Sequence, residues 1–360
     1  MSDLKLIVLD NFKEVGEKIV NHLGVDDCLI DFKASRFSNG EGKVNITGTV
    51  RGRDIFILSD VGNYGITYKM HGLDHRMSPD DHFQDIKRVI SAISGQADKI
   101  TIVMPLLYQS RQHRKKGKES LDCALALQEL ERLGVNHIVT MDCHDPNVCN
   151  AIPNLPFENF YPTNTILEDY INNENTDDLL VISPDAGAMD RARYYAEMLG
   201  VDVGLFYKRR DLSKVVNGKN PIVEHMYLGS SIEGKNILVV DDMIASGSSM
   251  LDVGKKLKEQ GANEVTFIAT FSLFTEGIEE FDKAYKAGLF DKLYTTNLTY
   301  IPKEYQEKEW FHTVDCSKRL AGIISTLHKH ESIKPINNSK EKIMKLLEEK
   351  NNNKVKELHK

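Results

Sequence analysis

The chain has 360 residues, of which 41% are hydrophobic and 28% are charged, with 24 glycines and 10 prolines. This composition is typical of a globular protein of about two domains, and it excludes collagen-like, mucin-like and globally disordered chains. The net charge of −7 argues against a nucleic-acid partner. No apolar run approaches the ~18 residues of a membrane helix, and residues 1–6 lack the order of a signal peptide. We therefore expect a cytoplasmic protein that does not bind a membrane.

Apolar runs alternate with amphipathic stretches along most of the chain. The runs predict strands at residues 4–10, 54–60, 99–105, 137–142, 179–185, 201–207, 236–242, 264–271 and 292–296. The amphipathic stretches predict helices at residues 120–134, 189–200 and 248–261, each ending at a glycine. Buried strands that alternate with helices of this length predict α/β units with parallel sheets.

A weak internal repeat indicates two similar domains in tandem. Residues 51–60 resemble residues 233–242, and the segment from Gly95 resembles the segment from Gly261. A Pro- and Asn-rich stretch interrupts the pattern near residues 159–162. We expect one domain at residues 1–161, a second at residues 162–332, and a polar C-terminal tail at residues 333–360 that forms a short exposed helix with a frayed end.

The five cysteines favour buried thiols over a disulfide framework, because their number is odd and the chain is long. Cys143 and His144, followed by Cys149, could suggest zinc. No second ligand pair at zinc-finger spacing accompanies them, so we do not expect a zinc site.

The segment 237–250 carries the strongest chemical signal. An apolar strand ends in Asp241 and Asp242, and a helix begins a few residues later. The loop between them holds Ser246, Gly247, Ser248 and Ser249. Backbone N–H groups at a helix start bind phosphate, and carboxylates accept hydrogen bonds from sugar hydroxyls or lie near a hydrated Mg²⁺. The segment therefore predicts a ribose 5-phosphate site; the alternative is an ordinary serine N-cap beside two solvated aspartates.

This segment, VVDDMIASGSS, resembles the fingerprint shared by type I phosphoribosyltransferases and ribose-phosphate diphosphokinases. Further segments in family order resemble the second family, also called ribose-phosphate pyrophosphokinase. They are the adenine-binding loop at 36–41, the ATP segment at 108–115, the magnesium motifs at 141–144 and 183–187, and the start of a mobile catalytic loop at 206–210. The resemblance covers about residues 4–332. It implies two tandem type I phosphoribosyltransferase-like α/β domains, each a mostly parallel sheet flanked by helices.

The resemblance also implies roles for individual residues. ATP would be bound by Phe37, Asn39, Glu41, Arg111 and Gln112. Ribose 5-phosphate would be bound by Asp241, Asp242 and the loop Ser246, Gly247, Ser248 and Ser249. The cofactor Mg²⁺ would be placed by His144 and Asp185. Lys208 and Arg210 would be catalytic, at the start of a polar lid at residues 211–221.

The implied activity is diphosphate transfer from Mg-ATP to the 1-hydroxyl of ribose 5-phosphate, giving AMP and 5-phosphoribosyl 1-diphosphate for nucleotide biosynthesis. Family members assemble from dimers into hexamers, so we expect a homo-oligomer. Two alternatives stay open: a phosphoribosyltransferase that consumes the diphosphate sugar, and a regulatory paralogue without catalysis. Ala245, where the family has an aspartate, and the altered loop 113–119 favour the paralogue. The retained residues Lys208, Arg210, His144 and Asp185 favour the enzyme.

Overall fold

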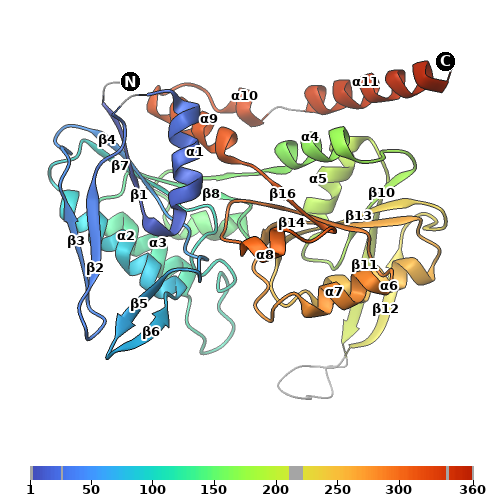
Figure 1. Cartoon of the computed structure of the whole chain (residues 1–360), viewed down its shortest axis with the longest axis horizontal. Helices are drawn as coiled ribbons and strands as arrows, with labels where there is room; N and C mark the ends of the chain where they lie inside the picture. The colour runs from blue at the N-terminus through green and yellow to red at the C-terminus, as the bar shows by residue number, and fades with distance from the viewer. Residues whose placement is uncertain (1–2, 26, 211–221, 338–339, 359–360) are drawn as a thin grey trace. The chain divides into compact units, whose positions relative to one another are not determined.

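The computed structural model describes residues 3–25, 27–210, 222–337 and 340–358. The chain divides into two compact units, whose elements are labelled in Figure 1. Unit 1 comprises residues 1–162, 297–302 and 315–337, and unit 2 comprises residues 163–296, 303–314 and 338–360. Each unit has its own main sheet and its own hydrophobic core.

Unit 1 is built on a five-stranded parallel sheet with the strand order β1-β4-β7-β8-β9. Its strands are β1 (Leu4–Val8), β4 (Asp54–Leu58), β7 (Lys99–Val103), β8 (His137–Met141) and β9 (Phe157–Phe160). Two antiparallel hairpins accompany the sheet, β2 (Phe32–Arg36) with β3 (Gly42–Ile46) and β5 (Thr67–Met70) with β6 (Leu73–Arg76). The helices are η1 (Asp10–Phe12), α1 (Lys13–Leu23), α2 (Pro79–Ile93), α3 (Asp122–Arg132), η2 (Pro146–Ala151), α9 (Ser317–His328) and α10 (Lys334–Asn337).

Helices cover both faces of the unit 1 sheet, with α2 and α3 on one side and α1 and α9 on the other (Figure 1). The inner strands are therefore nearly continuous apolar runs, as parallel strands covered on both faces require. The start of α2 is set by a capping box, in which Ser78 and Asp81 each accept a hydrogen bond from the other's backbone N–H. Pro79 at the first helical position is already restricted to a helical backbone angle.

Unit 2 is built on a seven-stranded sheet with the strand order β12-β11-β10-β13-β14-β15-β16, in which only the β11–β12 pair is antiparallel. Its strands are β10 (Leu179–Ser183), β11 (Val203–Arg210), β12 (Ile222–Leu228), β13 (Asn236–Ile244), β14 (Glu264–Ser272), β15 (Lys292–Thr296) and β16 (Phe311–Val314). Its helices are α4 (Thr163–Asn173), α5 (Met189–Leu199), α6 (Ser248–Glu259), α7 (Glu279–Lys286), α8 (Lys303–Gln306) and α11 (Lys340–Leu358).

The unit 2 sheet is also covered on both faces. Helices α4, α5 and α11 pack on one face, and α6 and α7 lie on the other (Figure 1). The fully buried Tyr170 of α4 and Tyr294 of β15 meet edge to face, with ring centroids 5.5 Å apart. Both units thus have the mostly parallel, helix-flanked architecture that the sequence predicts, and all nine predicted strands and all three predicted helices are present.

The chain does not divide into the two contiguous stretches that we expected. Residues 297–302, which lie between β15 and β16 of unit 2, and residues 315–337, which follow β16, belong to unit 1. The second of these segments contains α9, which packs against α1. It is held by contacts between distant residues, such as the 2.8 Å hydrogen bond between His328 Nδ1 and Asp54 Oδ2. Contacts of this kind leave no periodic signal in the sequence.

The expected exposed tail at residues 333–360 is wrong for its helical part. Helix α11 packs against α4 and α5, and its Ile343 is fully buried in the unit 2 core. The apolar residues Ile343, Met344, Leu346 and Leu347 lie in a Lys- and Glu-rich stretch, which we interpreted as an exposed helix.

The cysteine and membrane expectations can be compared with the described residues. Cys28, Cys123, Cys143 and Cys316 are buried, Cys149 is partly buried, and none of the five is in a disulfide. Within the described part of the chain, no helix combines the length and the hydropathy needed to span a bilayer.

Candidate active site

The carboxyl ends of three neighbouring strands, β11, β10 and β13, meet at one edge of the unit 2 sheet. Asp185 follows β10 by two residues. Asp241 lies two residues beyond Val239, which pairs with Ile182 near the end of β10. Because ligands of open α/β sheets bind beyond the carboxyl ends of the strands, this edge is the candidate site of unit 2.

Asp241 and Asp242 are adjacent carboxylates at this edge. The Asp242 N–H donates a hydrogen bond of 2.9 Å to Asp241 Oδ1, and Asp242 is 3% exposed. Burial raises the pKa of Asp241 well above its ordinary value, and the neighbouring Asp242 carboxylate raises it further. A cation or a set of hydroxyl donors bound here would stabilise the ionised form of the pair.

Arg191 is a site residue that the sequence analysis missed. It lies in the first turn of α5, and its Nη1 is 3.8 Å from Asp241 Oδ1. Its positive charge acts to lower the pKa of Asp241, against the effects of burial and of Asp242. The sequence could have indicated Arg191 through its position, because α5 begins directly after the 183–187 motif and therefore at the same edge of the sheet.

The loop after β13 forms a tight approach to the start of α6. Gly247 is the N-cap residue with φ +80°, and a Cβ at this position would lie 2.2 Å from Phe281 Cζ. Only glycine satisfies both restrictions. The Ser246 and Ser248 hydroxyl oxygens are 3.3 Å apart. Since the first N–H groups of a helix lack intrahelical acceptors, these hydroxyls and the helix start present several donors to an anion.

Asp185 also has a structural role. Its Oδ1 accepts hydrogen bonds from the N–H groups of Gly187 at 2.8 Å and Ala188 at 3.2 Å, next to the start of α5. Its backbone oxygen accepts from the Ser183 hydroxyl at 2.6 Å. Both carboxylate bonds use Oδ1, so Oδ2 is the atom that could contact a cation.

The backbone of β11 carries Lys208 and Arg210 to the same edge. Leu205 pairs with Ser183, the last residue of β10, and β11 continues for five residues beyond this pair. Lys208 pairs with His225 of β12, and the register shifts between Arg209 and Arg210. The proposed lid at 211–221 lies outside the described residues.

In unit 1, the predicted ATP residue Arg111 and the predicted metal residue His144 lie on loops after the neighbouring parallel strands β7 and β8. The two loops are joined through His113. Its ring lies edge-on to the His144 ring at 5.2 Å, and its Nε2 is 3.4 Å from Asp145 Oδ2. Arg111 and His144 are both exposed.

The carboxylate of Asp145 accepts hydrogen bonds from residues of both loops. Its Oδ2 accepts a 2.8 Å hydrogen bond from Arg114, and its Oδ1 accepts one from the Asn147 N–H at 2.9 Å. Partial burial acts to raise the pKa of Asp145, but these bonds outweigh it and the pKa is lowered overall. The carboxylate therefore stays ionised and holds the basic loop against the segment after β8.

Gln112 is engaged within its own loop. Its side-chain amide donates to the backbone oxygen of Ser120 at 2.8 Å and to that of Arg114 at 3.3 Å. These bonds hold the loop closed, so the side-chain NH₂ group of Gln112 is already used. A contact to ATP would involve its other polar atom or its backbone.

The predicted adenine residues lie on the turn between β2 and β3. Phe37 is 55% exposed. The Asn39 amide donates to Glu41 Oε2 at 2.9 Å, and the Glu41 N–H donates to Asn39 Oδ1 at 3.1 Å. Within the described residues, no hydrogen bond, ion pair or ring contact joins this turn to Arg111 or His144, so unit 1 presents two separate groups of predicted residues.

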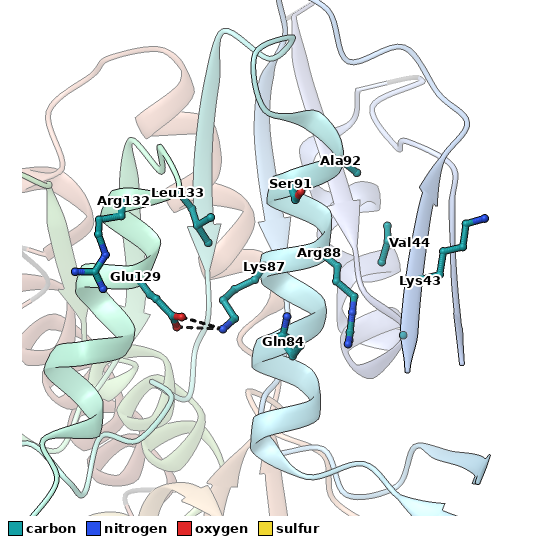
Figure 2. Close-up of a pocket in the computed structure, with 11 residues that line it drawn as sticks. Lys43, Val44, Gln84, Lys87, Arg88, Ser91, Ala92, Glu129, Arg132 and Leu133 are labelled. Atoms are coloured by element: carbon teal, nitrogen blue, oxygen red, sulfur yellow. Dashed lines mark hydrogen bonds and ion pairs between the residues drawn. The ribbon is translucent and has the colours of Figure 1, made fainter. Parts of the chain in front are cut away.

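A pocket of about 600 Å³ lies between β3, α2 and α3 (Figure 2). Lys87 of α2 reaches across it to Glu129 of α3, with its Nζ 3.1 Å from both carboxylate oxygens. The pocket is lined by none of the predicted site residues. In the described parts of the chain, no three His, Cys, Asp or Glu side chains gather in a way that could hold a metal ion.

Comparison with known proteins relates these features to a family. The model for the N-terminal domain of ribose phosphate pyrophosphokinase matches residues 4–134, and the phosphoribosyl transferase domain model matches residues 162–296. A ribose-phosphate pyrophosphokinase of Ralstonia nicotianae is 31% identical over 268 residues, covering 73% of this chain and 77% of that protein. Another, of Chlorobaculum tepidum, is 28% identical over 340 residues, covering 94% of this chain and 96% of that protein.

A solved structure has the same fold. The crystal structure of phosphoribosylpyrophosphate synthetase from Mycobacterium smegmatis matches with a TM-score of 0.75 at 21% identity, over 91% of this chain and 99% of that one. The two domain models in order, with relatives matched over most of their length, lead to one assignment: the chain belongs to the ribose-phosphate pyrophosphokinase family.

Proposed function

We propose that this protein transfers the β,γ-diphosphate of Mg-ATP to the 1-hydroxyl of ribose 5-phosphate, giving AMP and 5-phosphoribosyl 1-diphosphate. The observation that carries the proposal is the edge of the unit 2 sheet, where the adjacent carboxylates of Asp241 and Asp242 are followed within a few residues by the start of α6. Such an edge suits a ligand with a phosphate at one end and vicinal hydroxyls at the other.

Ribose 5-phosphate is held at this edge. Its phosphate accepts hydrogen bonds from the Ser246 and Ser248 hydroxyls and from the N–H groups at the start of α6. Its ring hydroxyls donate to Asp241 and Asp242. The position of Ala245 supports an intact loop, because its backbone oxygen accepts a 3.0 Å hydrogen bond from the Thr275 N–H although its side chain carries no acid.

The transfer is one displacement. The 1-hydroxyl oxygen of the sugar attacks the β-phosphorus of ATP, and the bond from that phosphorus to the oxygen bridging to the α-phosphate breaks. AMP leaves with the bridging oxygen, and the hydroxyl proton is released. The protein aligns two anions and stabilises the charge that develops during transfer. We assign this stabilisation to Lys208 and Arg210, on the part of β11 that continues beyond β10.

Mg²⁺ fits part of the donor set. Mg²⁺ prefers oxygen ligands and is commonly held by one or two carboxylates together with substrate phosphates, so it does not need a cluster of three protein ligands. The Asp185 carboxylate suits this role, and the exposed imidazole of His144 is the second residue that we assign to it. Bound there, Mg²⁺ would neutralise phosphate charge.

ATP is bound by unit 1 residues in this proposal. Phe37 offers an exposed ring for stacking on the base, while Asn39 and Glu41 present an amide and a carboxylate in a fixed mutual arrangement. Arg111 is an exposed cation for the phosphates. As in the family, we expect the protein to act as a homo-oligomer.

Identification of the nucleotide product tests the proposal. Purified protein with Mg²⁺, ATP and ribose 5-phosphate should form AMP, and omission of ribose 5-phosphate should abolish its formation. ADP as the product would show single phosphoryl transfer and would contradict the proposal. Formation of neither nucleotide would favour the regulatory paralogue. Consumption of added 5-phosphoribosyl 1-diphosphate with a nucleobase would favour a phosphoribosyltransferase.

A further inference from the structure

The segment after β4 forms a hairpin, β5–β6, whose two faces differ in chemistry. Tyr68 pairs with His75, and Met70 pairs with Leu73, so these four side chains share one face. Lys69 and Asp74 form an exposed 3.4 Å ion pair on the other face.

The turn of this hairpin has a defined geometry. His71 has φ +49° and Gly72 has φ +81°, the positive pair that a two-residue type I′ turn requires. The turn thereby exposes the backbone N–H of His71 beyond the ends of the strands.

This hairpin lies beside the β2–β3 hairpin and contacts its turn (Figure 1). The His71 N–H donates a 2.8 Å hydrogen bond to the Ser38 backbone oxygen. At Gly40, which has φ +92°, a Cβ would lie 2.7 Å from Met70 Sδ, so the Met70 side chain packs directly on the backbone of this glycine. The contact therefore involves the middle of the turn that carries Phe37, Asn39 and Glu41.

A second contact lies at the base of the turn. The Arg36 guanidinium is 5.4 Å from the centroid of the Tyr68 ring, within the range of a cation–π interaction. The same guanidinium makes two hydrogen bonds to the Asp85 carboxylate of α2, at 2.8 and 2.6 Å, and both side chains are 8% exposed. Tyr68 thus packs on a residue that is itself fixed to the body of unit 1.

Within the turn itself, the backbone is held only by hydrogen bonds between residues of the turn. The Gly40 N–H donates to the Phe37 oxygen at 2.9 Å, and the Phe37 N–H donates to the Glu41 oxygen at 2.8 Å. The strands β2 and β3 pack on α2 and on the unit 1 core, but the turn lies beyond them, so outside support for the turn comes from β5–β6. A loop that is ordered before binding loses less conformational entropy when the ligand arrives, so external support raises affinity.

We propose that the β5–β6 hairpin holds the Phe37–Glu41 turn in its nucleotide-binding conformation, with Tyr68 and Met70 as positioning residues. This inference rests on the proposed function, which assigns ATP to that turn. The hairpin should therefore affect the binding of ATP, and neither the binding of ribose 5-phosphate nor the rate of the transfer step.

The test compares substitutions on the two faces of the hairpin. The variant Tyr68→Ala with Met70→Ala removes the contacts to Arg36 and Gly40. The control, Lys69→Ala with Asp74→Ala, removes an exposed pair of side chains from the opposite face of the same hairpin, whereas Tyr68 and Met70 are half-buried. Tyr68→Phe keeps the ring beside Arg36 and serves as the rescue variant. The readouts are the KM for ATP, the KM for ribose 5-phosphate, kcat, and amide hydrogen exchange at Phe37 and Gly40.

We expect the Tyr68/Met70 variant to raise the KM for ATP by about tenfold and to speed amide exchange in the turn. Its kcat and its KM for ribose 5-phosphate should change by less than about twofold, and the control and Tyr68→Phe should behave like the unmodified protein. A general loss of folding would lower kcat and thermal stability instead, and would show that the hairpin is only structural.

Failure of this inference is distinguishable from failure of the proposed function. If the unmodified protein forms AMP and the Tyr68/Met70 variant has an unchanged KM for ATP, the hairpin does not position the turn and the inference falls alone. If the unmodified protein forms no AMP, the proposed function is contradicted, and so is the nucleotide-binding role of the turn.

Discussion

At the scale of single residues, the proposed function assigns the pair Asp241 and Asp242 to an anionic substrate although both are acidic. In this proposal the carboxylates face the hydroxyl end of the sugar, while N–H and O–H donors a few residues later bind the phosphate. Burial raises the pKa of Asp241, and the neighbouring Asp242 charge raises it further. Hydroxyl donors or a cation bound at the pair would favour the ionised form of both carboxyl groups.

Replacing both carboxylates by amides, as Asp241→Asn with Asp242→Asn, should raise the KM for ribose 5-phosphate at least tenfold. Each carboxylate would lose charge-assisted hydrogen bonds of roughly 1.5–3 kcal/mol to sugar hydroxyls. Steady-state kinetics with ribose 5-phosphate as the varied substrate measures the effect. Asp252→Asn, at an exposed position of α6, is the control. An unchanged KM in the double variant would mean that the pair does not contact the sugar.

Asp60 is a second acidic residue whose environment controls its protonation. It is 1% exposed at the end of β4 and accepts hydrogen bonds from the Gly62 N–H, the Thr299 hydroxyl and the Tyr300 N–H. Burial raises the pKa of Asp60 to about 7, although these bonds act to lower it. It connects β4 to the 297–302 segment, which returns to unit 1 late in the chain.

The stability of the protein should therefore decrease as pH rises through the range in which Asp60 titrates. An acid with a pKa of about 7 when folded and about 3.8 when unfolded is protonated more strongly in the folded state, so its contribution is present below about pH 4 and is lost as pH rises to about 7. Asp60→Asn cannot titrate. In urea denaturation, the stability of the unmodified protein relative to this variant should decrease between about pH 4 and about pH 7. A relative stability that stays constant over this range would show that Asp60 is already ionised when folded.

Arg191 and Asp60 mark the limit of residue-level prediction. The aspartates at 241 and 242 could be assigned from sequence because they occur within one short motif. Arg191 contacts Asp241 across fifty residues, and Asp60 contacts Thr299 across 239 residues. Such partners come together only when the sheet has formed.

At the scale of elements, the start of α6 depends on one glycine. Gly247 has a positive φ and also faces the Phe281 ring of α7, so a side chain there would move the helix start away from its neighbours. The donors that we propose for the phosphate belong to that helix start, so stability and phosphate affinity should change together.

Gly247→Ala should lower stability by more than the ~1–2 kcal/mol of a left-handed residue alone, and it should raise the KM for ribose 5-phosphate. Gly234→Ala separates the two effects. Gly234 has φ +72° with no atom within 4 Å of an added Cβ, so it carries only the backbone penalty and should leave the KM unchanged. Urea denaturation and steady-state kinetics measure both variants. Equal behaviour of the two variants would mean that the Phe281 contact has no part in shaping the site.

The strands and their ends were the most predictable elements. The runs 179–182 of β10 and 237–240 of β13 are continuously apolar because both faces of the sheet are covered, and this pattern is visible in the sequence. The β5–β6 hairpin was not predicted. Its apolar face alternates over only two residues in each strand, and its packing partner is a distant turn.

At the scale of the whole molecule, the order of the two units could be predicted but their composition could not. The repeat indicated a change of unit near residue 162, where the division occurs. The return of α9 to unit 1 and the packing of α11 on unit 2 depend on surfaces formed by distant helices. Amphipathic patterns show that a helix has a buried face, but they do not show which sheet will bury it.

The packing of α11 can be tested by truncating one side chain. Ile343→Ala should lower stability by about 2 kcal/mol, because a fully buried side chain is removed from the unit 2 core. The neighbouring Met344, at 37% exposure, is the control, and Met344→Ala should have less than about half that effect. Thermal unfolding of the full chain measures both. Equal and small effects would show that α11 does not pack on the unit.

The central claim is that the two terminal phosphates of one ATP molecule move together to the sugar. Parallel reactions with ATP carrying ³²P in the α-position or in the γ-position follow each phosphate through a single turnover with ribose 5-phosphate. The account predicts that the γ-label appears in the diphosphate sugar and the α-label appears in AMP, in equal amounts. Transfer of the γ-label to the sugar with the α-label recovered in ADP would contradict it.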